Sequence, residues 1–246
     1  MQGNVHVEEF ISYAESVPRA LEAAGAEALL AGESCVLIKP NLVNASPPPV
    51  TLPVEAAEAI VRFVRSCSDA RIVIGEGSGD PRLPTAEAFA IHGYERIAGE
   101  QGVELVDLND APLVRKELPR CRVFPHIFLP ALLWESFVIS AAVLKAHSLA
   151  AATLTMKNMV GCAPPAHYQQ GGYWRKGAFH AEMDEAVADL NRYRTPDLCL
   201  IDAAVGMTGN HLNGSLCDPP VGKIVTGTDP VAVDAAGAAL LGIHWR

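Results

Sequence analysis

Short apolar runs alternate with segments of helical spacing along most of the chain. Runs of strand length lie at 35–39, 71–75, 103–107, 137–140, 198–202 and 223–227. Helical spacing occupies residues 11–24, 54–65, a segment from about 84, 181–194 and 230–241. Because strands alternate with helices over short connections, the pattern predicts an α/β fold with a mostly parallel, doubly wound sheet and helices on both faces, in three layers. We expect a single domain over residues 1–246.

Two segments do not follow this alternation. Residues 121–129 contain Pro125, which predicts an edge strand or a covering hairpin. Residues 163–180 combine prolines and glycines with Tyr168, Tyr173 and Trp174. Exposed aromatic side chains are unfavourable unless they pack on a ligand, a partner or the domain itself, so we expect this segment to be a lid or covering segment.

Composition narrows the class of protein. The 246 residues are 50% hydrophobic and 19% charged, enough for a large core and too apolar for extensive disorder. With Lys+Arg 19 against Asp+Glu 28 and no basic run, we expect no nucleic-acid partner. No stretch approaches the ~20 consecutive apolar residues of a membrane span, and the first residues lack the pattern of a secretion signal, so we expect a cytoplasmic protein without membrane association.

The six cysteines are dispersed and form no Cys-x-x-Cys pair. Several lie in predicted strands, which favours reduced core thiols over disulfides or a zinc site. We expect no iron–sulfur cluster in this chain, because such clusters need grouped cysteines.

The candidate chemistry is concentrated in residues 137–162. This stretch offers Lys145, His147, Lys157 and Asn158, and no acidic residue lies between positions 135 and 182. Cations among apolar residues need an anion to offset their desolvation, so in a chain of net charge −9 the stretch predicts an anion site. The alternative is that both lysines extend from a surface helix to solvent and the histidine is an ordinary half-buried side chain.

Other candidates follow predicted strands. Lys39 and Asn41 come at the end of the 35–39 strand, before a proline-rich turn, and Asp202 ends the 198–202 strand. The carboxyl ends of strands form the ligand edge of open α/β sheets, so we expect these side chains at the site. Alternatively, Lys39 reaches solvent, while Asn41 and Asp202 close local turns. The glycine-rich loop 76–80 is only weak evidence for an anion site. Its acidic residues suit a hydroxyl or a metal ion better than a phosphate.

Asp234 is the one charged residue in an otherwise apolar helix that starts after the N-cap Asp229. A carboxylate in a buried helix must be paired or hydrogen-bonded. Asp234 therefore either takes part in the site or binds nearby backbone N–H groups.

Several motifs occur in order along the chain. They are VLIKPNLV at 36–43, Thr51-x-Pro53, VLKAH at 143–147, TLTMKNMVG at 153–161, His180, LIDAAVGMTGN at 200–210 and GTDPVAVDAAGAALLG at 227–242. Together they resemble the family catalogued as domain of unknown function 362. Many of its members carry an appended ferredoxin-like segment that binds iron–sulfur clusters, and the family is often described as ferredoxin- or oxidoreductase-associated. This chain has no Cys-x-x-Cys-x-x-Cys run, and its loop 210–214 departs from the glycine- and proline-rich loop of the family, which implies a different ligand specificity.

The sequence therefore predicts that a small anion, carboxylate or phosphate, binds at the carboxyl edge of the sheet. Lys39, Lys145 and Lys157 would bind its charge, Asn41 and Asn158 would orient it, and His147 and His180 are the acid–base candidates. The implied reaction is lysine- and histidine-assisted proton transfer next to a carbonyl or carboxylate, as in an isomerase or lyase. One alternative is a redox accessory protein that docks a ferredoxin-type or flavin partner. Another is a metal site built from His147, His180, Asp202 and Asp234. The sequence does not identify a cofactor.

Overall fold

The computed structural model describes residues 5–170 and 172–244. Its central element is a sheet in the order β1-β11-β9-β7-β2-β3-β4, to which β8 adds beside β7 and β10 beside β9. The strands are β1 (Val5–Glu9), β2 (Cys35–Lys39), β3 (Arg71–Glu76), β4 (Glu104–Asp107), β7 (Phe137–His147), β8 (Ala151–Thr153), β9 (Leu198–Thr208), β10 (Ser215–Leu216) and β11 (Lys223–Gly227).

Most of the long strands run in one direction. β9, β7, β2, β3 and β4 are parallel neighbours, whereas β11 runs antiparallel to β9 and β1 antiparallel to β11. The predicted mostly parallel α/β sheet is confirmed, and it contains all six predicted strands. The β11 strand joins it in the antiparallel direction.

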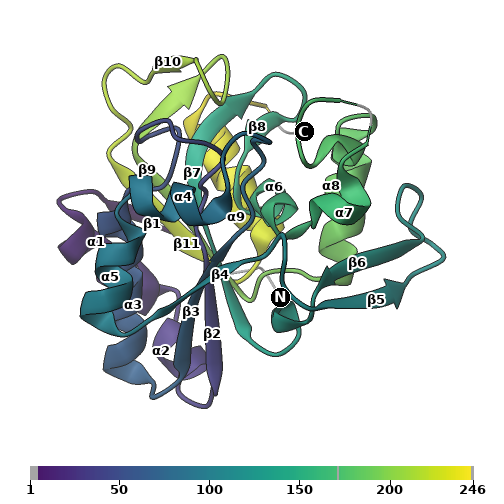
Figure 1. Cartoon of the computed structure of the whole chain (residues 1–246). Helices are drawn as coiled ribbons and strands as arrows, with labels where there is room; N and C mark the ends of the chain where they lie inside the picture. The colour runs from purple at the N-terminus through teal and green to yellow at the C-terminus, as the bar shows by residue number, and fades with distance from the viewer. Residues whose placement is uncertain (1–4, 171, 245–246) are drawn as a thin grey trace.

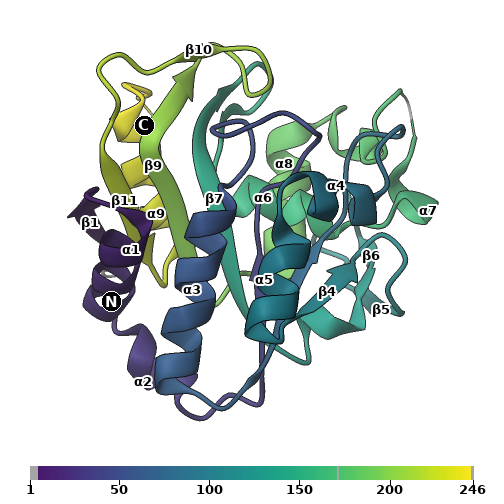
Figure 2. The same cartoon turned by 60° about the vertical axis from the view of Figure 1, so that its left-hand side comes forward.

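Helices cover both faces of this sheet (Figures 1 and 2). One face carries α1, α2, α3 and α5; the other carries α8 and α9. The α-helices are α1 (Tyr13–Ala23), α2 (Ala26–Leu30), α3 (Val54–Cys67), α4 (Thr85–Ile91), α5 (Tyr94–Gln101), α6 (Thr155–Asn158), α7 (Pro165–Tyr168), α8 (Met183–Tyr193) and α9 (Pro230–Leu240). Short 3-10 helices are η1 (Ala131–Leu133), η2 (Met159–Cys162) and η3 (Gly177–Phe179).

Strand alternation divides the core between these faces. Along β9, Leu200 packs in the cluster of α1 and α3, while Cys199 and Ile201 pack in the cluster of α9. Successive side chains of a strand point to opposite faces, so an apolar run without polar interruptions is what a sheet covered on both sides requires.

A separate hairpin of β5 (Leu113–Glu117) and β6 (His126–Pro130) packs against the α8 side of the molecule. Ile127 and Leu129 bury their side chains there. The sequence predicted an edge strand or a covering hairpin at 121–129, and the hairpin is what forms. Its partner β5 has largely exposed side chains and no strong hydrophobic pattern, so it was not predicted.

Two central strands are longer than their apolar runs. β7 continues from the predicted 137–140 to His147, and β9 continues from the predicted 198–202 to Thr208, with an irregular register between Val143 and Lys145. The extension of β7 beyond the end of β2 places Lys145 and His147 on a strand above the carboxyl edge. In the described residues no helix is long and apolar enough to cross a bilayer.

Candidate functional site

A cavity of about 320 Å³ lies where β2 and β3 end and β7 continues. It contains seven of the nine predicted site residues: Lys39, Asn41, Lys145, His147, Lys157, Asn158 and His180. Glu76, Thr153, Lys176 and His211 also line it. Four lysines and one carboxylate therefore share this space, and the rest of its wall is of mixed polarity.

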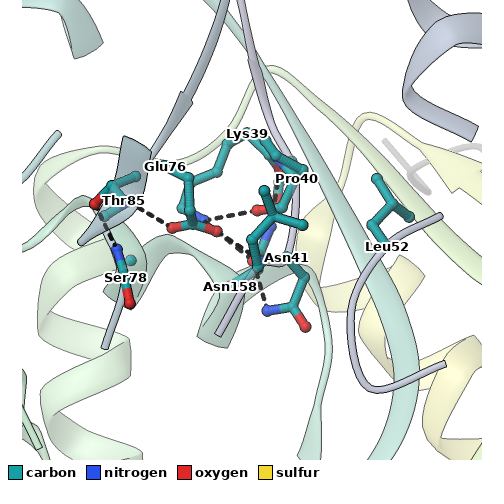
Figure 3. A network of polar contacts seen from close by, with 12 residues as sticks. Lys39, Pro40, Asn41, Leu52, Glu76, Ser78, Thr85 and Asn158 are labelled. Atoms are coloured by element: carbon teal, nitrogen blue, oxygen red, sulfur yellow. Dashed lines mark hydrogen bonds and ion pairs between the residues drawn. The ribbon is translucent and has the colours of Figure 1, made fainter. Parts of the chain in front are cut away.

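Two neighbouring strands end in opposite charges. Lys39 is the last residue of β2 and Glu76 the last of β3, and their Nζ and Oε2 atoms are 2.7 Å apart in a pair that is almost fully buried (Figure 3). Lys39 Nζ also donates to Pro40 O and Asn158 Oδ1, so all three of its N–H groups have acceptors. Glu76 Oε2 in addition accepts the backbone N–H of Leu42. The pair fixes the floor of the cavity and leaves Lys39 no N–H for a ligand.

Asn158, at the end of α6, ties that short helix to the sheet. Its Nδ2 donates to the carbonyl of Lys39 and to Ser140 Oγ, and its Oδ1 accepts from Asn41 Nδ2 at 3.1 Å (Figure 3). Both side-chain amides are thus used within the protein. Asn41 and Asn158 lie at the cavity and orient protein groups, Lys145 among them. That they also orient a ligand stays a prediction.

Lys145 is fully buried on the extended part of β7, directly opposite Thr153 of β8. Its Nζ donates to Asn41 Oδ1 at 2.6 Å and to Val50 O at 2.5 Å. Burial, followed by the charge of Lys157, lowers the pKa of Lys145 to about 7. Near neutral pH this amine is therefore divided between its charged and neutral forms.

Lys157 lies on α6 and lines the same cavity while remaining partly exposed. Burial lowers its pKa to about 8, so it is mainly protonated at pH 7. No ion pair of Lys157 or Lys145 occurs among the described residues, where the cavity's one carboxylate, Glu76, bonds Lys39. The cavity thus holds positive charge that the protein itself does not neutralise.

The aromatic segment 163–180 forms one side of the cavity through Trp174 and Lys176. Lys176 is buried and its Nζ donates to Asn109 Oδ1 and to the carbonyls of Gly161 and Ala163, which uses all three N–H groups. Burial lowers its pKa to about 7. The segment lines the cavity, and its role as a lid or covering segment stays a prediction.

His147 is held in one tautomer. Its Nδ1 accepts the backbone N–H groups of Leu149 at 3.0 Å and Ala150 at 3.2 Å in the β7–β8 turn, so the proton of the neutral ring is on Nε2. Burial, and then the charge of Lys157, lowers its pKa to about 3. The ring stacks on His211, with centroids 4.0 Å apart. The His147 ring is therefore neutral near pH 7 with its proton on Nε2, and its predicted acid–base role stays a prediction.

Two polar atoms of the cavity wall are buried without a partner among the described residues: Thr153 Oγ1 and His211 Nδ1. Burial lowers the pKa of His211 to about 4, so this ring is also neutral at physiological pH. An unsatisfied buried donor or acceptor costs roughly 1–3 kcal/mol. These atoms lie beside the lysines and point to the cavity as a ligand site.

The two predicted aspartates lie elsewhere. Asp202 is in the middle of β9, not at its end, and faces α1, where it accepts from the Tyr13 hydroxyl at 3.1 Å and from the N–H of Ala204. Strand alternation from Leu200 explains this direction. Burial raises its pKa to about 6. The prediction that Asp202 ends its strand was wrong, because the strand continues past Gly206 to Thr208.

Asp234 lines a second, neighbouring cavity that it shares with Lys157. Its carboxylate accepts the N–H groups of Thr155 and Met156 and the Thr155 hydroxyl, the bonds that hold the start of α6. Burial raises its pKa to about 6. The expected bonds from Asp234 to nearby backbone N–H groups are present, and a part of Asp234 in the site stays a prediction.

The alternative of a metal site requires His147, His180, Asp202 and Asp234 to lie close together. His147 and His180 line the first cavity, whereas Asp202 and Asp234 do not. Among residues 5–170 and 172–244 no group of three or more His, Cys, Asp or Glu is placed to hold a metal ion. All six cysteines are unpaired.

Four of the wall residues described above were not predicted from the sequence. Glu76 could have been found from its place at the end of β3 beside the strand that ends in Lys39. Lys176 was not predicted because it lies in an irregular segment. His211 was not predicted because it lies in the loop 210–214, where the sequence differs from the usual family pattern. Thr153 gave no signal of its own, because its position opposite Lys145 depends on the β7–β8 turn.

Comparison with family models agrees with the resemblance found from the sequence motifs. No match was found among curated proteins. Residues 36–239, which include β2 to α9 and every cavity residue discussed above, match the model of the family described as Domain of unknown function (DUF362). The chain therefore belongs to the DUF362 family.

Proposed function

We propose that this protein binds a small anion, a carboxylate or a phosphate, in the cavity at the carboxyl ends of β2 and β3. The observation that carries the proposal is the pair Lys145 and Lys157, which line the cavity without a carboxylate partner among the described residues. A buried cation is costly unless an anion offsets it, and the site's own Glu76 already bonds Lys39. The ligand would supply the missing charge.

The reaction we propose is proton transfer next to a carbonyl or carboxylate, as in an isomerase or lyase. Two features support it: a lysine that is partly neutral near pH 7, and fixed hydrogen-bond donors for developing negative charge, His147 Nε2–H and the Lys157 ammonium. His180, whose pKa burial lowers, lies at the cavity on the covering segment and can exchange protons with solvent.

The test is calorimetric titration of the purified protein with inorganic phosphate and with small mono- and dicarboxylates. Lys157→Met removes the charge and keeps the length of the side chain, so it should weaken binding at least about tenfold, as expected for the loss of a charge-assisted hydrogen bond. Lys116→Met is the matched control, because Lys116 lies on the exposed hairpin strand β5. Equal affinity in Lys157→Met and the parent protein would show that the cavity is not the anion site.

A further inference from the structure

The four lysines of the cavity differ in how much of their bonding capacity the protein uses. Lys39 and Lys176 each contact three acceptors, the full set for an ammonium group. The N–H groups of both lysines are therefore occupied by protein acceptors, although burial lowers the pKa of Lys176 to about 7. Lys145 and Lys157 are left as the lysines that can engage a bound molecule.

Lys145 has two acceptors, Asn41 Oδ1 and Val50 O. A neutral amine has two N–H groups and one lone pair, so these contacts satisfy both N–H groups of the neutral form and leave its lone pair without a protein partner in the wall of the cavity. Burial and the neighbouring charge of Lys157 favour that form, the arrangement that activates a lysine as a nucleophile. Lys157 itself stays mainly protonated at pH 7 and attracts an anion next to that amine.

We propose that Lys145 forms a Schiff base with 2-oxo acids, whose carboxylate binds Lys157 while the adjacent carbonyl carbon bonds to Lys145 Nζ. This inference rests on the proposed anion site and narrows its ligand class. A 2-oxo acid carries the required negative charge directly beside a carbonyl, so one small molecule meets both lysines.

The covalent step is balanced without another reactant. The lone pair of Nζ adds to the carbonyl carbon, the C=O π bond breaks, and a proton passes from nitrogen to oxygen to give a carbinolamine. Loss of that oxygen as water leaves a C=N bond, and a proton from solvent turns the imine into an iminium. His147 Nε2–H is the wall group proposed to bind the oxygen. The iminium then withdraws electrons from the neighbouring carbon, which acidifies its proton, in line with the proposed reaction class.

The inference is tested by incubating the intact protein at pH 7.5 with pyruvate or with 2-oxoglutarate and adding sodium borohydride. Hydride reduces an imine to a stable secondary amine, which intact-mass spectrometry detects and peptide mapping locates. We expect an adduct on Lys145 in the parent protein and its loss in Lys145→Met. Lys116→Met should label as the parent protein does. Mapping in the parent protein keeps the test decisive even if Lys145→Met folds poorly.

Calorimetry of the same two 2-oxo acids separates the inference from the function on which it rests. If they bind without forming an adduct, Schiff-base chemistry is wrong and the anion site stands. An adduct on Lys157 or on another lysine also overturns the assignment of Lys145. Absence of both an adduct and any anion binding in the titrations would reject the proposed function together with the inference.

Discussion

The fixed tautomer of His147 determines what this residue can do. To accept a proton on Nδ1 it would have to break two bonds to backbone N–H groups, and burial already opposes its charged form. A histidine in this state polarises an oxygen and does not act as a general base near neutral pH.

We therefore expect His147 to stay neutral over the range in which an ordinary histidine titrates. The measurement is ¹⁵N-detected NMR of the histidine side chains from pH 5 to pH 8. The His147 ring, assigned through His147→Gln, should keep one Nε2-protonated signature throughout, because its pKa is about 3. A midpoint for His147 between pH 6 and 7 would restore its acid–base role.

At the scale of elements, the floor of the cavity depends on η2 lying against the ends of β2 and β3. Gly161 has no side chain, and a Cβ there would lie 2.2 Å from Glu76 Oε1 and 2.6 Å from Lys39 Nζ. Lys39 Nζ bonds Glu76 Oε2, and Glu76 Oε1 accepts the backbone N–H of Gly77, so neither atom can move aside without losing a partner.

Gly161→Ala should destabilise the protein by roughly 1–3 kcal/mol, the usual cost of overpacking, and should weaken anion binding through displacement of the pair. Urea denaturation and phosphate titration measure the two effects. Gly99→Ala is the matched control: its Cβ meets nothing within 4 Å on the exposed side of α5, and it should stabilise by up to about 1 kcal/mol. If Gly161→Ala behaved like Gly99→Ala, the Lys39–Glu76 pair would not be in close contact with η2.

The sequence was informative wherever hydrophobic periodicity decides the structure. Apolar runs of β2, β3, β7 and β9 identified the sheet, and cations after a buried strand identified most of the cavity. Periodicity carries no information about how far a strand continues through polar residues, so the β7 and β9 extensions were missed and Asp202 was assigned to the wrong place. Which N–H groups remain free depends on contacts far apart in the chain, such as Lys145 with Val50, and no local pattern encodes them.

For the molecule as a whole, a lysine-rich cavity makes stability depend on pH. Lys145 and Lys176 have pKa values of about 7 in the folded protein, and lysines in the unfolded chain titrate near ~10.4. Between these values the unfolded chain binds more protons, so the free energy of unfolding rises with pH. Each such lysine contributes up to about 1.4 kcal/mol per pH unit.

Lys157, whose pKa burial lowers to about 8, adds to this rise within the window from pH 7.5 to 8.5, and the other shifted groups act mainly outside it. The pKa values of Asp202 and Asp234 are raised to about 6, so these carboxyls lower stability as pH rises between about 4 and 6 and contribute no further change above it. Lowered pKa values make the three cavity histidines raise stability with pH only up to about 7. Buried thiols such as Cys162, with a raised pKa of about 12, lower stability mainly above pH 8.5.

We therefore expect the free energy of unfolding, measured by urea denaturation, to increase from pH 7.5 to pH 8.5 in the parent protein. Lys145→Met should reduce that increase by up to about 1.4 kcal/mol, since it removes one lysine that is neutral when folded and charged when unfolded. Lys116→Met, which removes an exposed lysine of β5, should leave the increase unchanged. The same pH dependence in Lys145→Met and the parent protein would mean that Lys145 keeps its proton in the folded state, and with that proton it could not be the nucleophile of the cavity.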